Sequence, residues 1–402
     1  MSRLRLNFRR AYRLRPAREA EPYYVSPVEV VADHASDIAP LPYSKGLGYF
    51  VVPTGANVRS IAADDFQVER LSLPLSLWVR LRLGLIFKTK KRLRFGGFSL
   101  FCYGAKPKRK LFTTFNQHVS DIGIPIDHDL IAGHPELVTG WPPMQAAERA
   151  ASPSNAPNAA AIAVYVYYED TWVDIAEALK RLTIPFDLIV TTVPWRDRPI
   201  ETIRRDFPDA EIRVVENRGR DIRPFLELLE SGRLDRYRYV CKIHGKKSVL
   251  GGRLPYYGAL WRRRCLFDLM AAPDIGRKIV DEFEHNPKVG MIGPRAFRLP
   301  SATVSPEGAW GENRAQTLEL GAKMGVPPER FRLDFYGGTM FWVRPEALKP
   351  LRDLRLARAC VDEGARIDGG IEHVVERLFS AAVRAAGYEL ADSDGEQVSR
   401  GR

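Results

Sequence analysis

The sequence predicts an α/β protein in which a mainly parallel, Rossmann-like sheet with helices on both faces follows a smaller β-rich region. Strand-like and helix-like segments alternate without interruption from residue 161 to residue 248. Continuous apolar runs such as AIAVYVYYED (161–170) are typical of strands that are buried on both faces. Basic loops follow two of these strands, which is where parallel sheets bind ligands.

Length and charge divide the chain into regions. The 402 residues suffice for two domains, and a composition of 45% hydrophobic and 27% charged residues is typical of a soluble globular protein. Residues 1–110 hold 21 Lys and Arg against 8 Asp and Glu, a balance of +13, so the net charge of +12 of the whole chain comes from this part. The predicted regions are a basic disordered arm (1–21), a β-rich basic region (22–141), a Pro/Ala/Ser/Asn-rich linker (142–160) and the α/β domain (161–395).

The cysteines and the amino terminus bear on location. The four cysteines are far apart and form no CxxC pair, so the sequence favours a reducing compartment without disulfides or a zinc site. The basic amino terminus lacks the apolar stretch of a secretory signal. We therefore expect a cytoplasmic protein.

The segment LSLPLSLWVRLRLGLIF (71–87) is the one candidate for membrane contact by hydropathy. Its apolar residues recur at every second position, which predicts a strand. A spanning helix is excluded because two arginines interrupt a run that is shorter than about 20 apolar residues. Wound as a helix, the segment has no polar face for interfacial binding. The following KTKKRLR (88–94) and FGGFSLFCYG predict a β-hairpin whose basic tip contacts lipid headgroups.

The α/β domain is predicted from period and composition, element by element. Strands are expected over 161–170, 186–193, 211–216, 239–243 and 288–292. Helices are expected over 171–182, 199–206, 222–229, 257–269 and 274–285, with a closing helix that begins near Asp368. The alternation implies parallel strands joined by crossover helices.

Two loops at the carboxyl edge of this sheet carry positive charge. NRGR (217–220) follows one strand, and the next strand ends in HGKKS (244–248). Parallel strands bring such loops together with the exposed start of the helix between them, and this favours phosphate. The predicted phosphate-binding site consists of Asn217, Arg218, Gly219, Arg220, Asp221, Lys242, His244, Lys246, Lys247 and Ser248. The alternative is that Asp221 only caps the helix and the cations are solvated surface charge.

Five motifs in order resemble the rhamnan synthesis F family of bacterial proteins. They are NRGRDIRPFLELL, YVCKIHGKKS, Trp261-Arg262, GGTMFWVRPEAL and DGGIEHVVERLF, and they cover roughly residues 160–390. The resemblance implies a glycosyltransferase in the assembly of rhamnose-containing cell-surface polysaccharides. The chain departs from the family at Tyr165, Gly245 and Gly370, where the family usually has His, Thr and Thr. These departures bear on sugar specificity.

The resemblance also implies a layout similar to GT-A glycosyltransferases, which place an Asp-x-Asp pair after a strand to hold a divalent metal. Here the strand ending at Ile243 leads into the basic loop instead. Two such strings occur elsewhere, Asp127-His128-Asp129 before the sheet domain and Asp392-Ser393-Asp394 in the tail. We therefore expect no metal and no cofactor, because the cations of the two loops take over the stabilisation of the diphosphate leaving group.

Glycosyl transfer with inversion needs a base for the acceptor hydroxyl. Asp368, His373 and Glu376 lie on or just before the closing helix and are the catalytic candidates. Asp368 equally fits a helix N-cap, and a His–Glu pair three residues apart is often structural. The candidates for sugar or acceptor binding are Trp261, Arg262, Gly338 and Trp342, although aromatic residues in apolar runs are also typical of a core.

Taken together, these patterns and the resemblance predict a peripheral membrane glycosyltransferase. It would move a deoxyhexose such as L-rhamnose from a nucleotide-sugar donor to a polyprenyl-linked glycan acceptor, with its basic amino-terminal region on an anionic membrane surface. A non-catalytic carbohydrate- or nucleotide-binding component of a synthase complex is the alternative. A nucleic-acid partner is not expected, because aromatic residues do not interleave with Lys and Arg in the basic region.

Overall fold

The computed structural model of the chain contains two compact units. The first comprises the described residues up to Trp141 together with 255–260, and the second comprises those from Pro142 onward apart from 255–260. The structure describes residues 11–16, 23–32, 35–44, 47–52, 57–60, 66–81, 90–95, 98–104, 134, 136–144, 159–194, 197–246, 255–301, 304–360 and 369–400.

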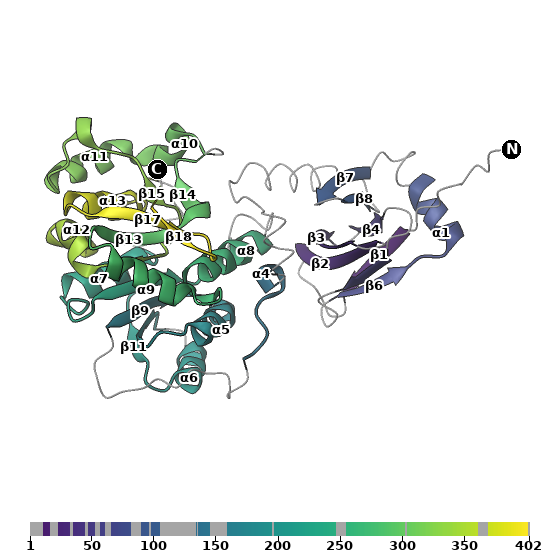
Figure 1. Ribbon diagram of the computed structural model, residues 1–402, viewed down its shortest axis with the longest axis horizontal. Helices are drawn as coiled ribbons and strands as arrows, with labels where there is room; N and C mark the ends of the chain where they lie inside the picture. The colour runs from purple at the N-terminus through teal and green to yellow at the C-terminus, as the bar shows by residue number, and fades with distance from the viewer. Residues whose placement is uncertain are drawn as a thin grey trace. The chain divides into compact units, whose positions relative to one another are not determined.

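The first unit is built on an antiparallel sheet (Figure 1). Its strands run in the order β5-β2-β3-β4-β1-β6, and β8 pairs with both β4 and β7. They are β1 (Ala11–Pro16), β2 (Tyr23–Ala32), β3 (Ala35–Ser44), β4 (Leu47–Val51), β5 (Asn57–Ser60), β6 (Phe66–Arg70), β7 (Lys90–Phe95) and β8 (Phe98–Gly104). The helices are α1 (Leu73–Trp78) and α4 (Glu136–Thr139).

Three expectations for this region need correction. Part of the arm predicted to be disordered is β1, which pairs with β4 and β6, because apolar and basic residues alternate there. The segment predicted as a strand over 71–87 is helical from Leu73 to Trp78, where Pro74 suits the first helical turn. The basic residues from Lys90 onward lie along the first strand of the β7–β8 hairpin and not at its tip.

The second unit is an α/β layer structure around a mostly parallel sheet. Its strand order is β11-β10-β9-β12-β16-β13-β17-β18. The strands are β9 (Ala160–Val166), β10 (Asp187–Thr192), β11 (Glu211–Val214), β12 (Tyr239–His244), β13 (Val289–Pro294), β16 (Phe341–Val343), β17 (Glu389–Ser393) and β18 (Val398–Ser399). Only β16 and β18 run against the others among these strands, so the predicted α/β class with a mainly parallel sheet is confirmed. A separate pair, β14 (Arg298–Leu299) and β15 (Phe335–Tyr336), lies outside this sheet.

Helices cover both faces of this sheet (Figure 1). Helices α7, α12 and α13 pack against one another, whereas α5 packs against α6 and shares contacts with α9 through the turn at 267–271. The helices of the unit are α5 (Trp172–Arg181), α6 (Asp197–Asp206), α7 (Ile222–Glu230), α8 (Pro255–Leu266, which begins in the first unit), α9 (Ile275–His285), α10 (Pro306–Trp310), α11 (Arg314–Lys323), α12 (Lys349–Asp353) and α13 (Ile371–Ala385). Short turns add η3 (Glu169–Thr171), η4 (Phe267–Ala271), η5 (Arg295–Phe297), η6 (Gly311–Asn313), η7 (Pro328–Arg330), η8 (Pro345–Leu348) and η9 (Leu356–Ala359).

Neighbouring side chains of β16 enter opposite layers. Phe341 meets Phe225 and Phe379 at ring-centroid distances of 6.2 and 5.0 Å, on the side of α7 and α13. Trp342 is fully buried and donates its indole N–H to the carbonyl of Leu269 on the side of α9. Strand alternation therefore explains why a run of apolar residues serves both layers.

The strand order fixes where the sheet can bind a ligand. The first strand of the unit, β9, has the second strand, β10, on one side and β12 on the other, both parallel to it. The order of the strands thus reverses between β9 and β12, and the carboxyl ends of strands at such a switch point are where open α/β sheets bind ligands. Within the described parts of the chain, no helix combines the length and apolar character needed to cross a membrane.

Candidate functional site

A buried ion pair lies at the carboxyl end of β12. The ammonium group of Lys242 donates to Asp221 Oδ2 at 2.5 Å, to Thr339 Oγ1 at 2.9 Å and to the Thr339 carbonyl at 3.0 Å. Thr339 Oγ1 in turn donates to Asp221 Oδ2 at 2.6 Å. Since an ammonium group has three N–H donors, Lys242 has none left for a ligand. In this structure Lys242 holds two loops together, and its direct binding of a diphosphate stays a prediction for which no donor is free.

Asp221 does not cap α7. Its backbone has helical dihedrals (φ −80°, ψ −9°), and its side chain accepts no capping hydrogen bond. Burial by itself raises the pKa of Asp221, but the charges of His244 and Lys242 and the hydrogen bonds from Lys242 and Thr339 outweigh it and hold that pKa well below its usual range. The carboxylate is therefore ionised at all ordinary pH values and serves as a fixed negative charge inside a cationic loop.

His244, by contrast, is neutral near pH 7. Burial is the main reason that its pKa falls to about 4, and the charges of Lys242 and Lys246 add to this effect while Asp221 opposes it. Its Nε2 lies 2.8 Å from the carbonyl oxygen of Gly338, so this nitrogen carries the proton and donates. His244 was predicted to offer positive charge to phosphate, but in this structure its burial keeps it uncharged near pH 7. Near pH 7 the cation beside Asp221 is therefore Lys242, and His244 adds its positive charge only at acid pH, where it opposes protonation of Asp221.

The turn at Gly338 and Thr339 is clamped from several sides. The N–H of Gly338 donates to Glu376 Oε1 at 2.6 Å, and its carbonyl accepts from His244. Gly338 has φ +85°, and a Cβ there would lie 3.0 Å from Nε1 of Trp261. Thr339, a β-branched residue, has φ +52°. A left-handed β-branched residue costs on the order of 1–3 kcal/mol, and such strain persists where surrounding contacts over-determine it.

Arg220 and His373 connect the first basic loop to the start of α13. The guanidinium Nη1 of Arg220 lies 3.0 Å from Nε2 of His373. Because arginine only donates, Nε2 of His373 accepts, and the proton of the neutral ring is on Nδ1. Arg220 also has a left-handed backbone, with φ +51°. The loop and the helix, 153 residues apart in sequence, meet at this contact.

The remaining loop residues are placed beside this centre. Arg218 is half-exposed and lies 3.6 Å from Glu216, while Gly219 supplies the positive φ (+64°) that the turn needs. Asn217 is half-buried. Lys246 lies over the ring of Trp261 at 4.2 Å from its centroid. Of the cations predicted to bind phosphate, those that keep some exposure in the described residues are Arg218, Arg220 and Lys246.

Two predicted sugar-binding residues are structural. Trp342 has no exposed surface, so it is a core residue and cannot stack on a sugar ring. Arg262 is buried and donates to Asp174 Oδ2 at 2.5 and 3.1 Å and to the carbonyl of Lys246. It holds the loop after β12 in place, which corrects its assignment to acceptor binding. Trp261 stacks on Phe297 at a centroid distance of 4.9 Å.

The departures from the family pattern lie at the same edge. Tyr165 pairs with His244 across β9 and β12. At Gly245, a Cβ would lie 2.2 Å from Thr171 Oγ1, so the Thr171 hydroxyl occupies the space that a side chain at position 245 would need. Predicted residues Asp368, Lys247 and Ser248 lie outside the described residues, as does the string Asp127-His128-Asp129.

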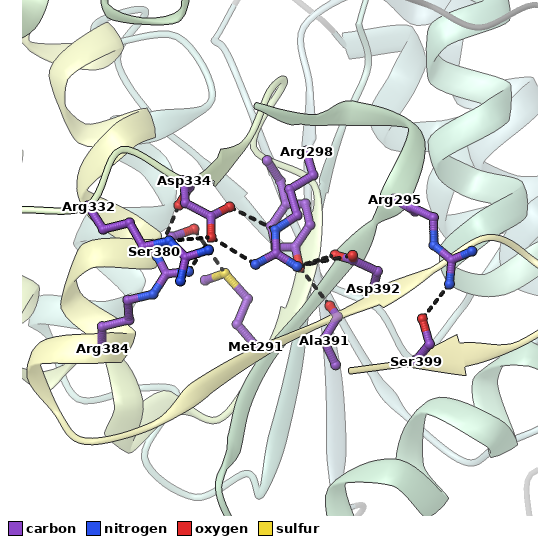
Figure 2. Close-up of polar contacts among 11 residues, drawn as sticks. Met291, Arg295, Arg298, Arg332, Asp334, Ser380, Arg384, Ala391, Asp392 and Ser399 are labelled. Carbon is purple, nitrogen blue, oxygen red and sulfur yellow. Dashed lines mark hydrogen bonds and ion pairs between the residues drawn. The ribbon is translucent and has the colours of Figure 1, made fainter. Parts of the chain in front are cut away.

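The first carboxylate of the second Asp-x-Asp string, Asp392, is part of a buried ion-pair network (Figure 2). Both oxygens of Asp392 accept from Arg298 Nη1 at 3.0 Å, and Arg298 also donates to Asp334 at 2.7 and 2.8 Å. Asp394 pairs with Arg295 at 2.9 Å. Both carboxylates of the string therefore form ion pairs with arginines. Among the described residues, no three His, Cys, Asp or Glu side chains converge in a manner that could hold a metal ion.

Sequence reasoning missed Thr339. It lies in the motif GGTMFW, in which the predicted binding residues were Gly338 and Trp342. A threonine directly after two glycines, at the entrance to a short apolar strand, is a signal of a tight turn with a hydroxyl in a special position. Its contact with Asp221 spans 118 residues, which no local pattern reveals.

Comparison with known proteins decides the family. Residues 138–388, more than half of the chain, match the family described as rhamnan synthesis protein F. The chain belongs to the rhamnan synthesis protein F family. In two strains of Xanthomonas campestris pv. campestris, proteins described as uncharacterized protein WxcX are each 30% identical to it over 233 residues. The match covers 58% of this chain and 32% of each relative, so the chain spans about a third of the length of these curated relatives.

The family match covers all parts of the candidate site described above. The matched residues contain the loop at 217–221, the end of β12, the turn at Gly338 and Thr339, and the start of α13. β1 to β8, which form the first unit's sheet, lie before the match begins. The resemblance of the motifs to the rhamnan synthesis F family is thereby confirmed.

Proposed function

We propose that this member of the rhamnan synthesis protein F family is a glycosyltransferase of polysaccharide synthesis with a GT-A-like arrangement. It transfers a sugar, L-rhamnose or a related deoxyhexose, from a nucleotide diphosphate to a lipid-linked cell-surface glycan. The observation that carries the proposal is the convergence of the family's motifs at the switch point of the sheet, where Asp221, Lys242 and Thr339 are tied together.

The backbone of the centre supports a functional role. Two non-glycine residues with left-handed backbones, Arg220 and Thr339, adjoin the same carboxylate, that of Asp221. Strained residues that cluster in this way indicate a site in which position matters more than stability. In the proposal, the Lys242–Asp221 pair and His244 hold the two loops, and the neighbouring exposed cations bind the donor.

The chemical step requires charge at the diphosphate. The bond between the anomeric carbon and the diphosphate oxygen breaks, and the nucleoside diphosphate leaves with the bonding electrons. Arg218, Arg220 and Lys246 neutralise that negative charge, so the step uses no metal ion. The acceptor oxygen forms the new bond from the opposite face, which inverts the anomeric configuration.

The base belongs to the region where α13 begins. His373 is half-buried, and its Nε2 accepts from Arg220. When Arg220 turns toward the diphosphate, this lone pair is released and His373 takes the proton of the acceptor hydroxyl. Glu376, bound to the N–H of Gly338, positions the turn. Asp368 remains the alternative base.

A second candidate function is that of a non-catalytic nucleotide- or carbohydrate-binding component of a synthase complex. The commitment of all three Lys242 donors and the neutral state of His244 favour it, because they remove two cations from those available to a leaving group. Such a component would bind nucleotide sugars without releasing a nucleoside diphosphate.

Incubation of the purified chain with a panel of nucleotide diphosphate sugars tests the proposal. Release of a nucleoside diphosphate from a deoxyhexose donor, retained in chelator and lost in His373→Ala and Arg220→Ala, is the expected result. Binding measured by calorimetry without release from any donor, with a lipid-linked acceptor supplied, would establish the binding component. Activity that disappears in chelator and returns with manganese or magnesium would refute the metal-independent step.

A further inference from the structure

The first unit presents an apolar turn to its surroundings. From Leu73 to Leu81, five large apolar side chains are between 41% and 49% exposed: Leu73, Leu75, Leu77, Trp78 and Leu81. Among the other residues whose burial the structure describes, the exposed large apolar side chains are Val173 and Val214, one on α5 and one at the end of β11. Residues 73–81 thus hold five exposed large apolar side chains within nine positions.

The orientation of this turn is fixed by its polar side. The hydroxyl of Ser76 accepts from the N–H of Ala11 at 3.2 Å and donates to the carbonyl of Leu71 at 3.4 Å. Ser76 and Val79 are buried against β1, and Val79 joins Leu71 and Ala11 in a small core. Contacts inside the unit therefore hold the leucines outward.

The polarity of α1 is the reverse of that of an ordinary surface helix. Leu73 and Leu77 lie one helical turn apart on the exposed side, and so do Pro74 and Trp78. A surface helix of a soluble domain buries such a stripe and exposes its serine. A contiguous apolar face held outward in this way marks a contact with something outside the unit.

Charge identifies the partner. Residues 70–94 contain no Asp or Glu and eight cations: Arg70, Arg80, Arg82, Lys88, Lys90, Lys91, Arg92 and Arg94. Apolar side chains in a stretch of sequence whose only charges are positive match an anionic lipid surface, where the apolar groups enter the acyl boundary and the cations meet headgroup phosphates. Trp78 is suited to the headgroup level, because indole is apolar with one N–H donor.

We propose that residues 73–81 insert into the surface of an anionic bilayer and anchor the chain there. Nine residues are too short to cross the hydrocarbon core, so the turn lies within the interface. This proposal rests on the proposed function only in that a lipid-linked acceptor gives the anchor a purpose. It differs from attraction of the basic region alone, because it requires the leucines.

Flotation of the full chain with vesicles tests it. We expect binding to vesicles of equal parts phosphatidylglycerol and phosphatidylcholine, and little binding to phosphatidylcholine alone. The variant L73S/L77S/L81S should bind the anionic vesicles about tenfold more weakly or worse, because three leucines no longer leave water. The matched control is V173S/V214S, which removes exposed apolar side chains of the second unit and should bind like the parent chain. Brominated lipids should quench the parent chain more strongly than Trp78→Phe.

Three outcomes would overturn the anchor. One is unchanged vesicle binding by the triple variant, with its thermal unfolding also unchanged. Another is binding without quenching of Trp78, which would show that headgroup charge acts alone. The third is absence of vesicle binding together with a concentration-dependent dimer that the triple variant abolishes, which would assign the face to a second copy. Donor hydrolysis measured without vesicles is a separate readout, so failure of the anchor leaves the transferase proposal intact.

Discussion

The ammonium nitrogen of Lys242 lies 2.5 Å from Oδ2 of Asp221, and Thr339 contacts both. The three residues come from β12, from the loop before α7 and from the turn before β16. Lys242 has only 2% of its side chain exposed, and Asp221 has 16%. One ion pair therefore joins three segments at the carboxyl edge of the sheet.

Replacing Lys242 by methionine should lower the free energy of unfolding of the second unit by about 3 kcal/mol or more, because the Asp221 carboxylate is left without its cation in a mostly buried position. Urea unfolding followed by circular dichroism measures the change. Lys349→Met is the control, since Lys349 pairs with Asp353 at 2.5 Å but both side chains are more than half exposed. The control should change stability by less than about 1 kcal/mol. Equal effects of the two substitutions would contradict the role of the buried pair.

The buried, neutral His244 makes stability depend on pH in a defined direction. Its pKa is about 4 in the folded state against 6.5 for the free side chain, so the unfolded chain binds more protons between these values. Stability is then fully present above pH 6.5 and falls by on the order of 3 kcal/mol as the pH drops toward 4. His244→Gln should flatten this slope, whereas His285→Gln, at an exposed position, should keep it. Urea titrations at several pH values give the slopes, and an unchanged slope in His244→Gln would show that another group is responsible.

Gly338→Ala separates steric contact from backbone strain when it is compared with Gly325→Ala. The two glycines have φ of +85° and +86°, so both substitutions incur the same left-handed cost of about 1 kcal/mol. A Cβ at 338 also meets Nε1 of Trp261 at 3.0 Å, whereas nothing lies within 4 Å of a Cβ at 325. We expect Gly338→Ala to cost about 1–3 kcal/mol more in unfolding free energy. It should also reduce donor turnover, while Gly325→Ala should not, and equal costs for the pair would rule out the contact with Trp261.

Arg220→Gly should lose activity without losing stability. Relief of a left-handed backbone offsets the added freedom of the unfolded chain, so the free energy of unfolding should change by less than about 1 kcal/mol. Release of nucleoside diphosphate should fall by about a hundredfold or more, because the guanidinium is removed from the leaving group. Arg355→Gly is the matched control, with φ +52° and an exposed side chain. A comparable loss of activity in the control would contradict the assignment of Arg220.

The sequence allowed the order of strands and helices from 160 to 294 to be predicted, because buried parallel strands and amphipathic helices have distinct periods. The meeting of the 217–221 loop with the end of β12 was also predictable from parallel topology, whereas the contact of Arg220 with α13 was not. The burial of Lys242 was not predictable. All six residues of β12 are buried, but a lysine in the sequence does not show whether its side chain is buried or exposed to solvent.

The helix at Leu73–Trp78 was misjudged for a different reason. Alternate apolar residues fit a strand, but the positions between them are small or proline: Ser72, Pro74 and Ser76. A helical turn accommodates these residues, and Ser72-Leu73-Pro74 suits a helix start. The outward face of that helix only becomes visible once Ser76 is seen bonded to β1. Tertiary contacts therefore decided between a helix and a strand, which the spacing of the apolar residues alone did not.

β16 lies between β12 and β13 in the sheet, although it comes after both in the chain. During synthesis, β12 and β13 emerge with no partner between them, and each has an open edge until residues 341–343 arrive. Open edges recruit other strands, so we expect a nascent or truncated chain that ends before β16 to be prone to aggregation. Residues 339–343 supply both the Thr339 turn and β16, so the same short segment completes the sheet and the site.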